Sequence, residues 1–295
     1  MNDNVAIIGG GPAGVATAVQ LKRHGINPLL FEQNELGGLA KNAWNIENYL
    51  GFPQGINGLE FVELLKKHIK KYGVDVHFEK VEHLDYDEDN ERFLMQTKEN
   101  IYEKNIVVVA TGTKPKKLAV AEKLPETLKK KTLYEIYPIL QIKNKQMAII
   151  GAGDAAFDYA LSLSKNNEVV ILNRGRVIKA LSVLTEKVRN NPKITYYEKT
   201  MITDIQKGKK RDLLINTDKT ENIEVDYLVA AIGRVPQKDF YSPKVTIMEK
   251  RLMDKEVLYL AGDVKNNRYR QTSIAIGEGV HTAMKIHQKI KRGKQ

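Results

Sequence analysis

Two glycine-rich stretches in this chain have the spacing that binds the phosphates of a dinucleotide. The first, residues 9–14 with the sequence GGGPAG, fits G-x-G-x-x-G and directly follows an apolar run. Gly9 permits a tight turn, Gly11 lets backbone N–H groups approach a pyrophosphate, and Gly14 lets a helix pack closely on a strand. Glu32 ends the next apolar run, where a carboxylate accepts hydrogen bonds from a ribose. Strand, glycines, helix, strand and acid in this order predict a bound dinucleotide.

The second stretch, residues 151–156, reads GAGDAA and fits G-x-G-x-x-A. At the end of the strand that follows it the acid is absent, and Asn173, Arg174 and Arg176 stand there instead. Arginines at this place suit a 2′-phosphate better than a bare ribose diol, so the pattern favours NADPH over NADH. The alternative is that these arginines only cap a surface turn.

The elements that position these glycines follow from apolar runs and helical spacing. All-apolar runs, typical of strands buried on both faces, precede both glycine turns and also Ala110-Thr111-Gly112, where a strand end meets a ligand. We expect helices at 15–23, 59–72, 157–163 and 273–290, the last carrying Ile274, Ile276, Met284 and Ile290. We expect strands at 5–8, 28–31, 74–84, 93–97, 105–112, 147–150, 168–173, 194–197, 213–216, 227–232 and 257–263.

Composition excludes several kinds of protein. No apolar run approaches the ~20 residues of a membrane helix, and a strand starting at Val5 leaves no room for a signal peptide. We therefore expect a cytoplasmic protein that does not bind membranes. The net charge of +11 favours an acidic partner, although a solvated lysine-rich surface would give the same charge. Nucleic acid is a poorer candidate, because no basic helix or aromatic RNA-binding motif accompanies the charge.

The chain contains no cysteine, which excludes a dithiol shuttle, a thiolate nucleophile and a Cys-ligated metal. No spacing of His, Asp or Glu indicates a metal site either.

The motifs above, with the stretch 47–53, Ala261-Gly262-Asp263 and Arg270-Gln271, closely resemble the low-molecular-weight thioredoxin reductase family over nearly the whole chain. The resemblance implies an α/β fold with two Rossmann-like dinucleotide-binding domains. The FAD-binding domain, residues 1–115 and 239–295, would be discontinuous, and the NAD(P)H-binding domain, residues 116–238, would be inserted into it. The implied cofactors are FAD and NADPH, and we expect a homodimer.

The resemblance also implies roles for single residues. Asp263 would contact the ribityl or phosphate part of FAD, and Gln271 the pyrimidine end of its ring system. The residues expected at FAD are Gly9, Gly11, Pro12, Ala13, Gly14, Glu32, Gln33, Gly38, Leu39, Asn48, Ala110, Thr111, Gly112, Gly262, Asp263, Arg270, Gln271 and Thr272. Those expected at NAD(P)H are Gly151, Gly153, Asp154, Ala155, Asn173, Arg174, Arg176, Ile232 and Gly233.

The chain departs from that family at its redox centre. Thioredoxin reductases carry C-x-x-C just before the second nucleotide-binding strand, and the corresponding positions here fall near Tyr134 and Tyr137. A phenol cannot form a mixed disulfide, so these tyrosines either stack near the flavin or fill a hole at a domain junction. Among the histidines, only His281 in the last helix is a candidate for a place near the flavin. No catalytic residue is certain, because hydride transfer to a flavin needs no general acid or base.

Without cysteines, the chain looks more like a second branch of this fold, the thioredoxin-reductase-type ferredoxin/flavodoxin–NADP reductases. These pass electrons from NADPH through the flavin to a small acidic carrier, which the basic charge favours. That branch usually carries a C-terminal extension over the flavin, whereas this chain ends at Gln295, soon after its last helix. Two alternatives stay open: a flavoenzyme that reduces a small-molecule acceptor such as a quinone or oxygen, and a non-catalytic FAD-binding redox sensor or subunit.

Overall fold

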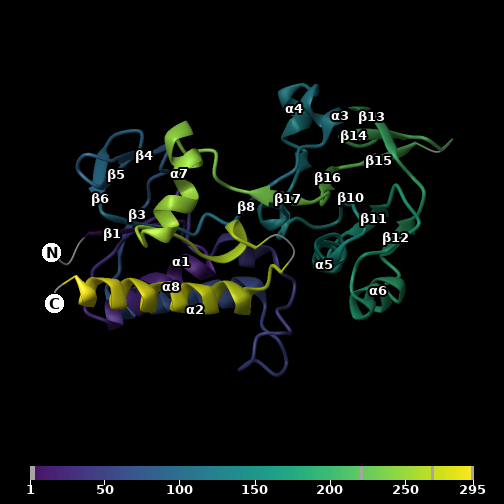
Figure 1. The fold of residues 1–295 in the computed structure, drawn as a ribbon. Coiled ribbons are helices and arrows are strands. Elements are labelled where there is room, and N and C mark those ends of the chain that lie inside the picture. Colours follow the sequence, from purple (N-terminus) through teal and green to yellow (C-terminus); the bar gives the residue numbers. More distant parts are fainter. Residues whose placement is uncertain (1–3, 220–221, 267–268, 294–295) are drawn as a thin grey trace. The chain divides into compact units, whose positions relative to one another are not determined.

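A computed structural model describes residues 4–219, 222–266 and 269–293, which divide into two compact units (Figure 1). Unit 1 comprises Met1–Lys41, Asn45–Lys114 and Val235–Gln295, and unit 2 comprises Asn42–Trp44 and Pro115–Arg234. Unit 2 is thus an insertion in unit 1. The boundaries differ slightly from those expected at 115/116 and 238/239.

The short segment Asn42–Trp44 was not expected to belong with unit 2. The Asn42 side-chain oxygen accepts hydrogen bonds from the backbone N–H groups of Ile136 (3.1 Å) and Tyr137 (2.9 Å). The Trp44 N–H donates to Asp158 Oδ2 at 3.1 Å, and the indole packs on the apolar core of unit 2. These contacts are tertiary, and no local pattern in the sequence indicates them.

The core of unit 1 is a five-stranded parallel sheet in the order β18-β7-β1-β2-β3. Ile8 pairs with Phe31 on one side and Val109 on the other, and Val109 pairs with Leu260. The residues after these four strands therefore meet at one edge of the sheet. The strands are β1 (Val5–Ile8), β2 (Leu29–Phe31), β3 (Asp75–His77), β7 (Ile106–Val109) and β18 (Leu258–Leu260).

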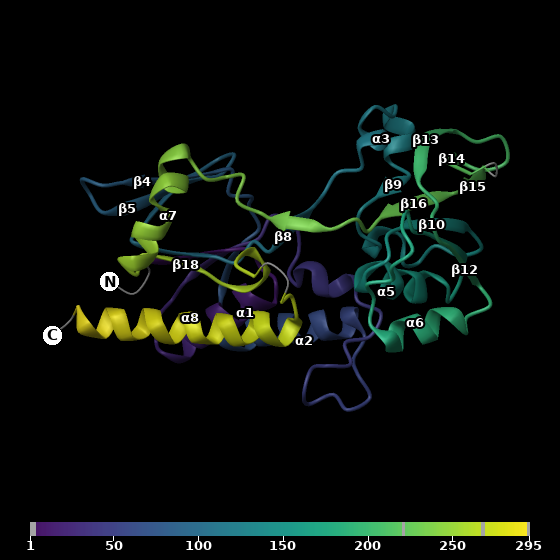
Figure 2. The same cartoon turned by 45° about the vertical axis from the view of Figure 1, so that its right-hand side comes forward.

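Helices and a second sheet sandwich this core. Helix α1 (Pro12–Arg23) packs against both α2 (Gly58–Tyr72) and α8 (Thr272–Arg292), and the three lie side by side in Figures 1 and 2. On the other face of the parallel sheet, Ala6 and Ile8 share a core with the antiparallel sheet β4-β5-β6 and with α7 (Pro243–Asp254). The antiparallel strands are β4 (His83–Asp87), β5 (Arg92–Gln96) and β6 (Ile101–Lys104), and the short helices are η1 (Gly38–Asn42) and η3 (Gly262–Val264).

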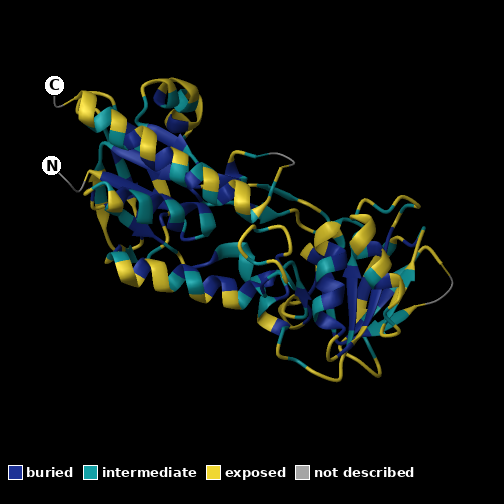
Figure 3. Cartoon of the chain, turned by 90° about the horizontal axis from the view of Figure 1, so that it is seen from below, coloured by how far each residue is buried: buried dark blue, intermediate teal, exposed yellow. Residues whose placement is uncertain are grey.

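Unit 2 repeats this layered plan. Its parallel sheet has the order β12-β11-β10-β16-β9, and Ile150 pairs with both Leu172 and Ala230. Its apolar strands are buried while the helices around them expose their outer faces, as Figure 3 shows. The strands are β9 (Thr132–Leu133), β10 (Gln146–Ile150), β11 (Glu168–Leu172), β12 (Ile194–Tyr197) and β16 (Tyr227–Ala230).

The two faces of the unit 2 sheet carry different elements. One face shares a core with α5 and α6, and the other with the antiparallel sheet β13-β14-β15 and with α3 and α4. These elements are α3 (Ala119–Glu122), α4 (Glu126–Lys129), η2 (Tyr137–Ile139), α5 (Asp154–Leu163), α6 (Ser182–Arg189), β13 (Ile202–Lys207), β14 (Leu213–Thr217) and β15 (Ile223–Val225). The connecting segments β8 (Thr113–Pro115) and β17 (Arg234–Pro236) pair as a two-stranded ribbon.

The α/β fold with two Rossmann-like units is therefore as expected, and the local structure adds detail in three places. The single strand expected at 74–84 is two strands, β3 and β4, separated by residues 78–82. Residues 233–236, where no strand was expected, contain strand β17. In α8, Ile274 and Met284 are exposed, and the buried positions are mostly small, such as Ala275, Gly279 and Ala283. Among the described residues, no helix is both long and apolar enough to cross a membrane.

Candidate functional site

The first glycine turn joins β1 to α1 in a conformation that only glycine adopts easily. Gly9 has φ +109°, and a Cβ built on it would lie 2.5 Å from the Ala110 carbonyl oxygen at the end of β7. A Cβ on Gly14 would lie 1.9 Å from the Gly9 carbonyl oxygen. By contrast, the nearest atom to a Cβ on Gly11 is 3.9 Å away, so the backbone there has open space in front of it. Gly11 is the N-cap of α1, whose first turn holds Pro12 and Ala13, and this helix end suits a phosphate.

Glu32 lies beside this turn, as the sequence predicts. Its Oε2 accepts the Gly10 N–H at 2.8 Å and its Oε1 accepts the Asn34 N–H at 3.0 Å. A carboxylate has about four acceptor positions, so each oxygen can still accept a ribose hydroxyl. Gly9, Glu32, Gln33 and Thr111 line one pocket of about 220 Å³ in unit 1. That volume is below the ~300–1,000 Å³ of whole small-molecule sites and suits one end of a dinucleotide.

Two further segments close around the same helix end. The Gly37 N–H donates to the Gly10 carbonyl at 2.8 Å, and a Cβ on Gly38 would lie 3.1 Å from the Gly11 Cα, which places Gly38 and the following Leu39 beside the turn. At the end of β7, the Thr111 hydroxyl donates to the Gln237 carbonyl at 2.6 Å, and the Gly112 carbonyl accepts the Gln237 N–H. The segment around Gln237, which returns from unit 2 to unit 1, is thus held against the residues that follow β7.

The C-terminal part of the chain returns to α1 through η3. A Cβ on Gly262 would lie 2.8 Å from the Ala13 Cβ, which brings Asp263, the next residue, to the start of α1. Sequence reasoning missed Glu278, whose Oε2 accepts the Gly262 N–H at 2.7 Å and whose Oε1 accepts from the Asn266 side chain at 3.0 Å. Glu278 lies in α8 between Gly277 and Gly279, outside both dinucleotide motifs, so no sequence signal marks it.

Residues far apart in the sequence also meet at the start of α8. The Asn48 side-chain amide donates to the side-chain oxygen of Gln271, the N-cap of α8, at 2.6 Å. Thr272 is the first residue of α8, and Arg270 Nε donates to the Asn266 carbonyl at 3.2 Å. Unit 1 therefore gathers the expected FAD residues at one sheet edge. The open space at Gly11, the acidic pocket beyond it and the tight glycine turn fit an adenine dinucleotide with free ribose hydroxyls.

The second glycine turn, in unit 2, repeats this backbone arrangement. Gly151 has φ +141°, and a Cβ on it would lie 2.5 Å from the Ala231 carbonyl oxygen. Gly153 is the N-cap of α5, and a Cβ on it would have no atom within 4 Å. Asp154 and Ala155 in the first turn of α5 are exposed, and Asp154 Oδ1 accepts the Leu181 N–H at 2.8 Å.

The loop after β11 differs from the corresponding place in unit 1. Asn173 is buried, its side-chain oxygen accepts the Gly175 N–H at 3.0 Å, and its amide donates to the Tyr196 hydroxyl at 2.8 Å. Asn173 thus shapes the loop, while Arg174 and Arg176 are exposed on it. Sequence reasoning missed a third exposed cation, Lys179. The backbone N–H of Lys179 donates to the Ala152 carbonyl, in the second glycine turn, at 2.7 Å.

The remaining candidates lie in unit 2 around Gly233 and Tyr134, and in unit 1 on α8. At the end of β16, Gly233 follows Ile232 with φ +108°, and its carbonyl accepts the Lys116 N–H at 2.9 Å. The Tyr134 hydroxyl accepts the Leu118 N–H at 3.0 Å, and Lys117 Nζ lies 4.7 Å from the ring centroid. His281 is exposed on α8, ten residues beyond Gln271, or about 15 Å along the helix axis. In residues 4–219, 222–266 and 269–293, no group of three His, Asp or Glu could hold a metal.

Comparisons with known proteins agree with this geometry. The chain is 28% identical over 306 residues to the NADPH-dependent thioredoxin reductase 3 of Arabidopsis thaliana, covering 96% of this chain and 57% of that relative. It is 27% identical over 311 residues to the thioredoxin reductase of Chlamydia pneumoniae, covering 96% and 97%. The crystal structure of Lactococcus lactis thioredoxin reductase superposes with a TM-score of 0.82 at 22% identity, covering 97% of this chain and 98% of that chain.

The sequence pattern of a whole protein family also matches the chain. Residues 3–279 match the pattern of the pyridine nucleotide-disulphide oxidoreductases, which extends across both units. Together with the two glycine turns, this match makes the chain a flavin-dependent pyridine-nucleotide oxidoreductase by family. The chain therefore belongs to the pyridine nucleotide-disulphide oxidoreductase family and has the fold of a thioredoxin reductase.

Proposed function

We propose that this protein passes electrons from NADPH, through FAD, to an external acidic carrier of the ferredoxin or flavodoxin kind. The observation that carries the proposal is the combination of two different dinucleotide turns with a chain that contains no cysteine. The relatives are thioredoxin reductases by name, but a dithiol cannot form in this chain. The electrons must therefore leave from the flavin itself.

FAD is assigned to unit 1 and NADPH to unit 2 by the charge beside each turn. The unit 1 pocket is lined by Glu32, Glu79, Glu82 and Asp239 against the single cation Lys80. Such a lining repels an additional phosphate and accepts ribose hydroxyls. The loop after β11 instead exposes Arg174, Arg176 and Lys179, which can pair with a 2′-phosphate.

The protein groups in this proposal bind and orient rather than transfer protons. Bound FAD would supply the redox chemistry, accepting a hydride from NADPH and releasing electrons singly to a carrier. Gly11 and the start of α1 would hold the pyrophosphate, and Glu32 would orient the ribose. Asn48 and Gln271 would fix the position of the flavin end through their mutual hydrogen bond.

The choice of an acidic carrier rests on the distribution of charge between the units. Residues 115–234 contain 22 Lys and Arg against 14 Asp and Glu, a net charge of +8 out of +11 for the chain. Exposed members of this set include Lys116, Lys117, Lys129, Lys130 and Arg211. Concentrated positive charge steers an acidic protein and raises its association rate by roughly 10–10³-fold.

Anaerobic stopped-flow kinetics test this function. The purified protein, loaded with FAD, is mixed with NADPH or NADH, and the reduced protein is then mixed with ferredoxin, flavodoxin or a quinone. We expect fast flavin reduction by NADPH and fast reoxidation by at least one of the two carriers. Fast reoxidation by the quinone alone would replace the carrier with a small-molecule acceptor. Failure of both nicotinamides to reduce the flavin would instead support a non-catalytic sensor or redox subunit.

A further inference from the structure

The break in the expected strand at 74–84 forms one wall of the unit 1 pocket. Between β3 and β4 the chain leaves the parallel sheet, and its residues Glu79, Lys80, Val81 and Glu82 all line the pocket together with Glu32 and Gln33. Val81 is buried in the unit 1 core, but Phe78, just before the wall, is 60% exposed, so no large apolar side chain fixes the start of the wall. Polar contacts therefore hold that start, at Glu79.

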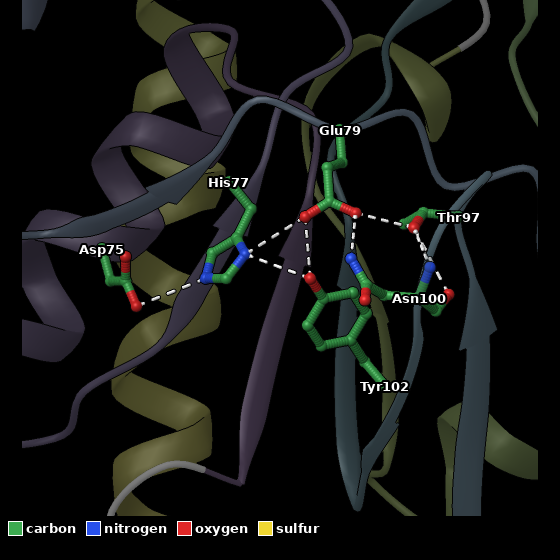
Figure 4. A network of polar contacts seen from close by, with 6 residues as sticks. All are labelled: Asp75, His77, Glu79, Thr97, Asn100 and Tyr102. Carbon is green, nitrogen blue, oxygen red and sulfur yellow. Dashed lines mark hydrogen bonds and ion pairs between the residues drawn. The ribbon is translucent and has the colours of Figure 1, made fainter.

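The carboxylate of Glu79 makes those contacts with one hairpin (Figure 4). Its Oε2 accepts from the Thr97 hydroxyl at 2.7 Å and from the Asn100 side-chain amide at 3.3 Å. Its Oε1 accepts from the Tyr102 hydroxyl at 2.7 Å. All three donors belong to the end of β5, the following turn and β6, so Glu79 connects the pocket wall to the antiparallel sheet.

The same network reaches the ribose-binding side of the pocket through His77. Its Nδ1 lies 3.3 Å from the Tyr102 hydroxyl and 3.5 Å from Glu79 Oε1, and its Nε2 lies 3.3 Å from Asp75 (Figure 4). The His77 carbonyl accepts the N–H of Glu32 at 2.9 Å, and the His77 ring packs against both Phe31 and Tyr102. Glu32 and the wall at 79–82 are therefore parts of one connected arrangement.

Glu79 and Tyr102 keep one protonation state each across the ordinary pH range. The hydroxyls of Thr97 and then Tyr102 contribute most to lowering the pKa of Glu79 to about 2. Burial, and next the Glu79 carboxylate, raise the pKa of Tyr102 to about 12. Glu79 therefore stays an acceptor and Tyr102 a donor.

We propose that Glu79 is a positioning residue for the adenosine end of the bound dinucleotide, because it holds the wall 79–82 in the shape that this end contacts. The proposal rests on the assignment of FAD to unit 1. Replacing the carboxylate by an amide leaves one acceptor oxygen and puts an NH2 group where the other oxygen was. The hydroxyl that faces this NH2 must then accept instead of donate, and the charge-assisted hydrogen bonds to Glu79 become weaker neutral ones.

The test measures ligand affinity in protein freed of flavin, using three probes: FAD, ADP and FMN. FAD and ADP contain the adenosine diphosphate end, and FMN lacks the adenosine part. For Glu79→Gln we expect the Kd of FAD and of ADP to rise about tenfold, the loss expected for one hydrogen bond to a charged group. The Kd of FMN should stay within twofold of the wild-type value. Thr97→Val should change the same two affinities in the same direction.

The matched control is Glu103→Gln, which removes a carboxylate charge from the hairpin that Glu79 contacts. Glu103 pairs with Arg92 at 2.5 Å and does not line the pocket. Exposed pairs of this kind contribute little, so all three affinities should stay at the wild-type values. Thermal unfolding without ligand shows whether each variant is folded.

The outcomes separate this proposal from the function it rests on. If the wild type binds neither FAD nor ADP, the assignment of FAD to unit 1 fails, and the role of Glu79 fails with it. If the wild type binds both and Glu79→Gln binds them equally well, only the role of Glu79 is wrong. An equal loss for FMN would also overturn it, because the effect would then be a general loss of structure. If Glu79→Gln does not fold, the same three affinities of Thr97→Val decide.

Discussion

The two glycine turns have nearly the same backbone and different surroundings. In both, the first glycine has positive φ, and a Cβ on it would lie 2.5 Å from a carbonyl oxygen at the end of a neighbouring strand. In unit 1 the next strand ends in Glu32, which faces an acidic pocket, whereas in unit 2 it ends in Asn173 and a loop of exposed cations. The shared geometry suits any dinucleotide, and in the proposed assignment the difference selects FAD for unit 1 and NADPH for unit 2.

The last position of the G-x-G-x-x-G/A motif shows a second difference between the turns. Gly14 has no room for a Cβ, since the Gly9 carbonyl oxygen would lie 1.9 Å away. In unit 2 this position is Ala156, which is fully buried and has the Cβ that Gly14 cannot carry. Helix α1 therefore lies closer to its glycine turn at this position than α5 does to its own. A Cβ atom at this position is tolerated in unit 2 and excluded in unit 1.

A valine at the second glycine of each turn gives the largest expected effect. Gly11 and Gly153 both have open space around a Cβ and φ values of −74° and −103°, which a valine can adopt. Gly11→Val should therefore fold and fill the phosphate space, raising the Kd of FAD roughly a hundredfold or more. Gly153→Val should stay yellow and lose reduction by NADPH. Flavin absorbance per chain and stopped-flow reduction measure the two effects, and full flavin occupancy in Gly11→Val would contradict the assignment of unit 1.

Removing the cations after β11 sharpens the comparison between the two loops. Arg174→Ala or Arg176→Ala, each made alone, should weaken NADPH roughly ten- to a hundredfold, because one charge-assisted pair is worth ~1.5–3 kcal/mol. The Kd of NADH should change little, and Arg189→Ala, an exposed arginine on α6, is the control. Equal weakening of NADPH and NADH would mean that these arginines only shape a surface turn.

Ionic strength should affect the two electron-transfer steps differently. If an acidic carrier docks on the basic surface of unit 2, its reduction rate should fall about tenfold as salt rises toward ~0.15 M. Reduction of the flavin by NADPH should change less over the same range, because that step occurs within the loaded protein. Stopped-flow rates for both steps at several salt concentrations provide the measurement. A carrier rate that does not depend on salt would remove the electrostatic argument for the partner.

The smallest expected effect is the loss of thermal stability in Glu79→Gln and its dependence on pH, which concerns unit 1 alone. The pKa of Glu79 is lowered to about 2 in the folded protein, so its contribution to stability is complete above the unfolded value of 4.5 and is lost as the pH falls from there through about 2. Glu79→Gln should therefore lower Tm by about 2–4 °C near neutral pH, the shift that ~1 kcal/mol produces at this size. The difference from wild type should disappear toward pH 2. A Tm difference that stayed constant across this range would show that ionised Glu79 is not stabilising.

Sequence reasoning succeeded where the chemistry is local. The turn at 9–14, the helix after it and Glu32 depend on residue types within one short stretch, and the structure has them as predicted. The break in the strand at 74–84 was missed because Val74, Val76 and Phe78 continue the apolar alternation of a strand. What ends β3 is tertiary: Glu79 binds the β5–β6 hairpin, and the Glu82 N–H donates to the Gln96 carbonyl at 2.8 Å.

Helix α8 shows why the rest could not be read from periodicity. Of the large residues that the helix carries, Ile274 and Met284 are exposed, and the face against α1 is built from small ones. A Cβ on Gly279 would lie 2.3 Å from the Ala13 carbonyl oxygen, so the two helices approach closely. Hydrophobic spacing identifies large buried side chains and misses such close contacts. Glu278 and Lys179 were missed for a related reason, since their roles depend on segments brought together only by folding.

The central claim is that the flavin is the sole redox centre and that electrons reach it from NADPH. An anaerobic reductive titration of the FAD-loaded protein tests this most directly, because it counts the electrons that each chain stores. The account predicts that one equivalent of NADPH per FAD, carrying two electrons, fully reduces the protein, and that further NADPH is not consumed. Uptake of four electrons per FAD would reveal a second redox centre, and no uptake from NADPH would show that unit 2 does not serve the flavin. Either result would contradict the account.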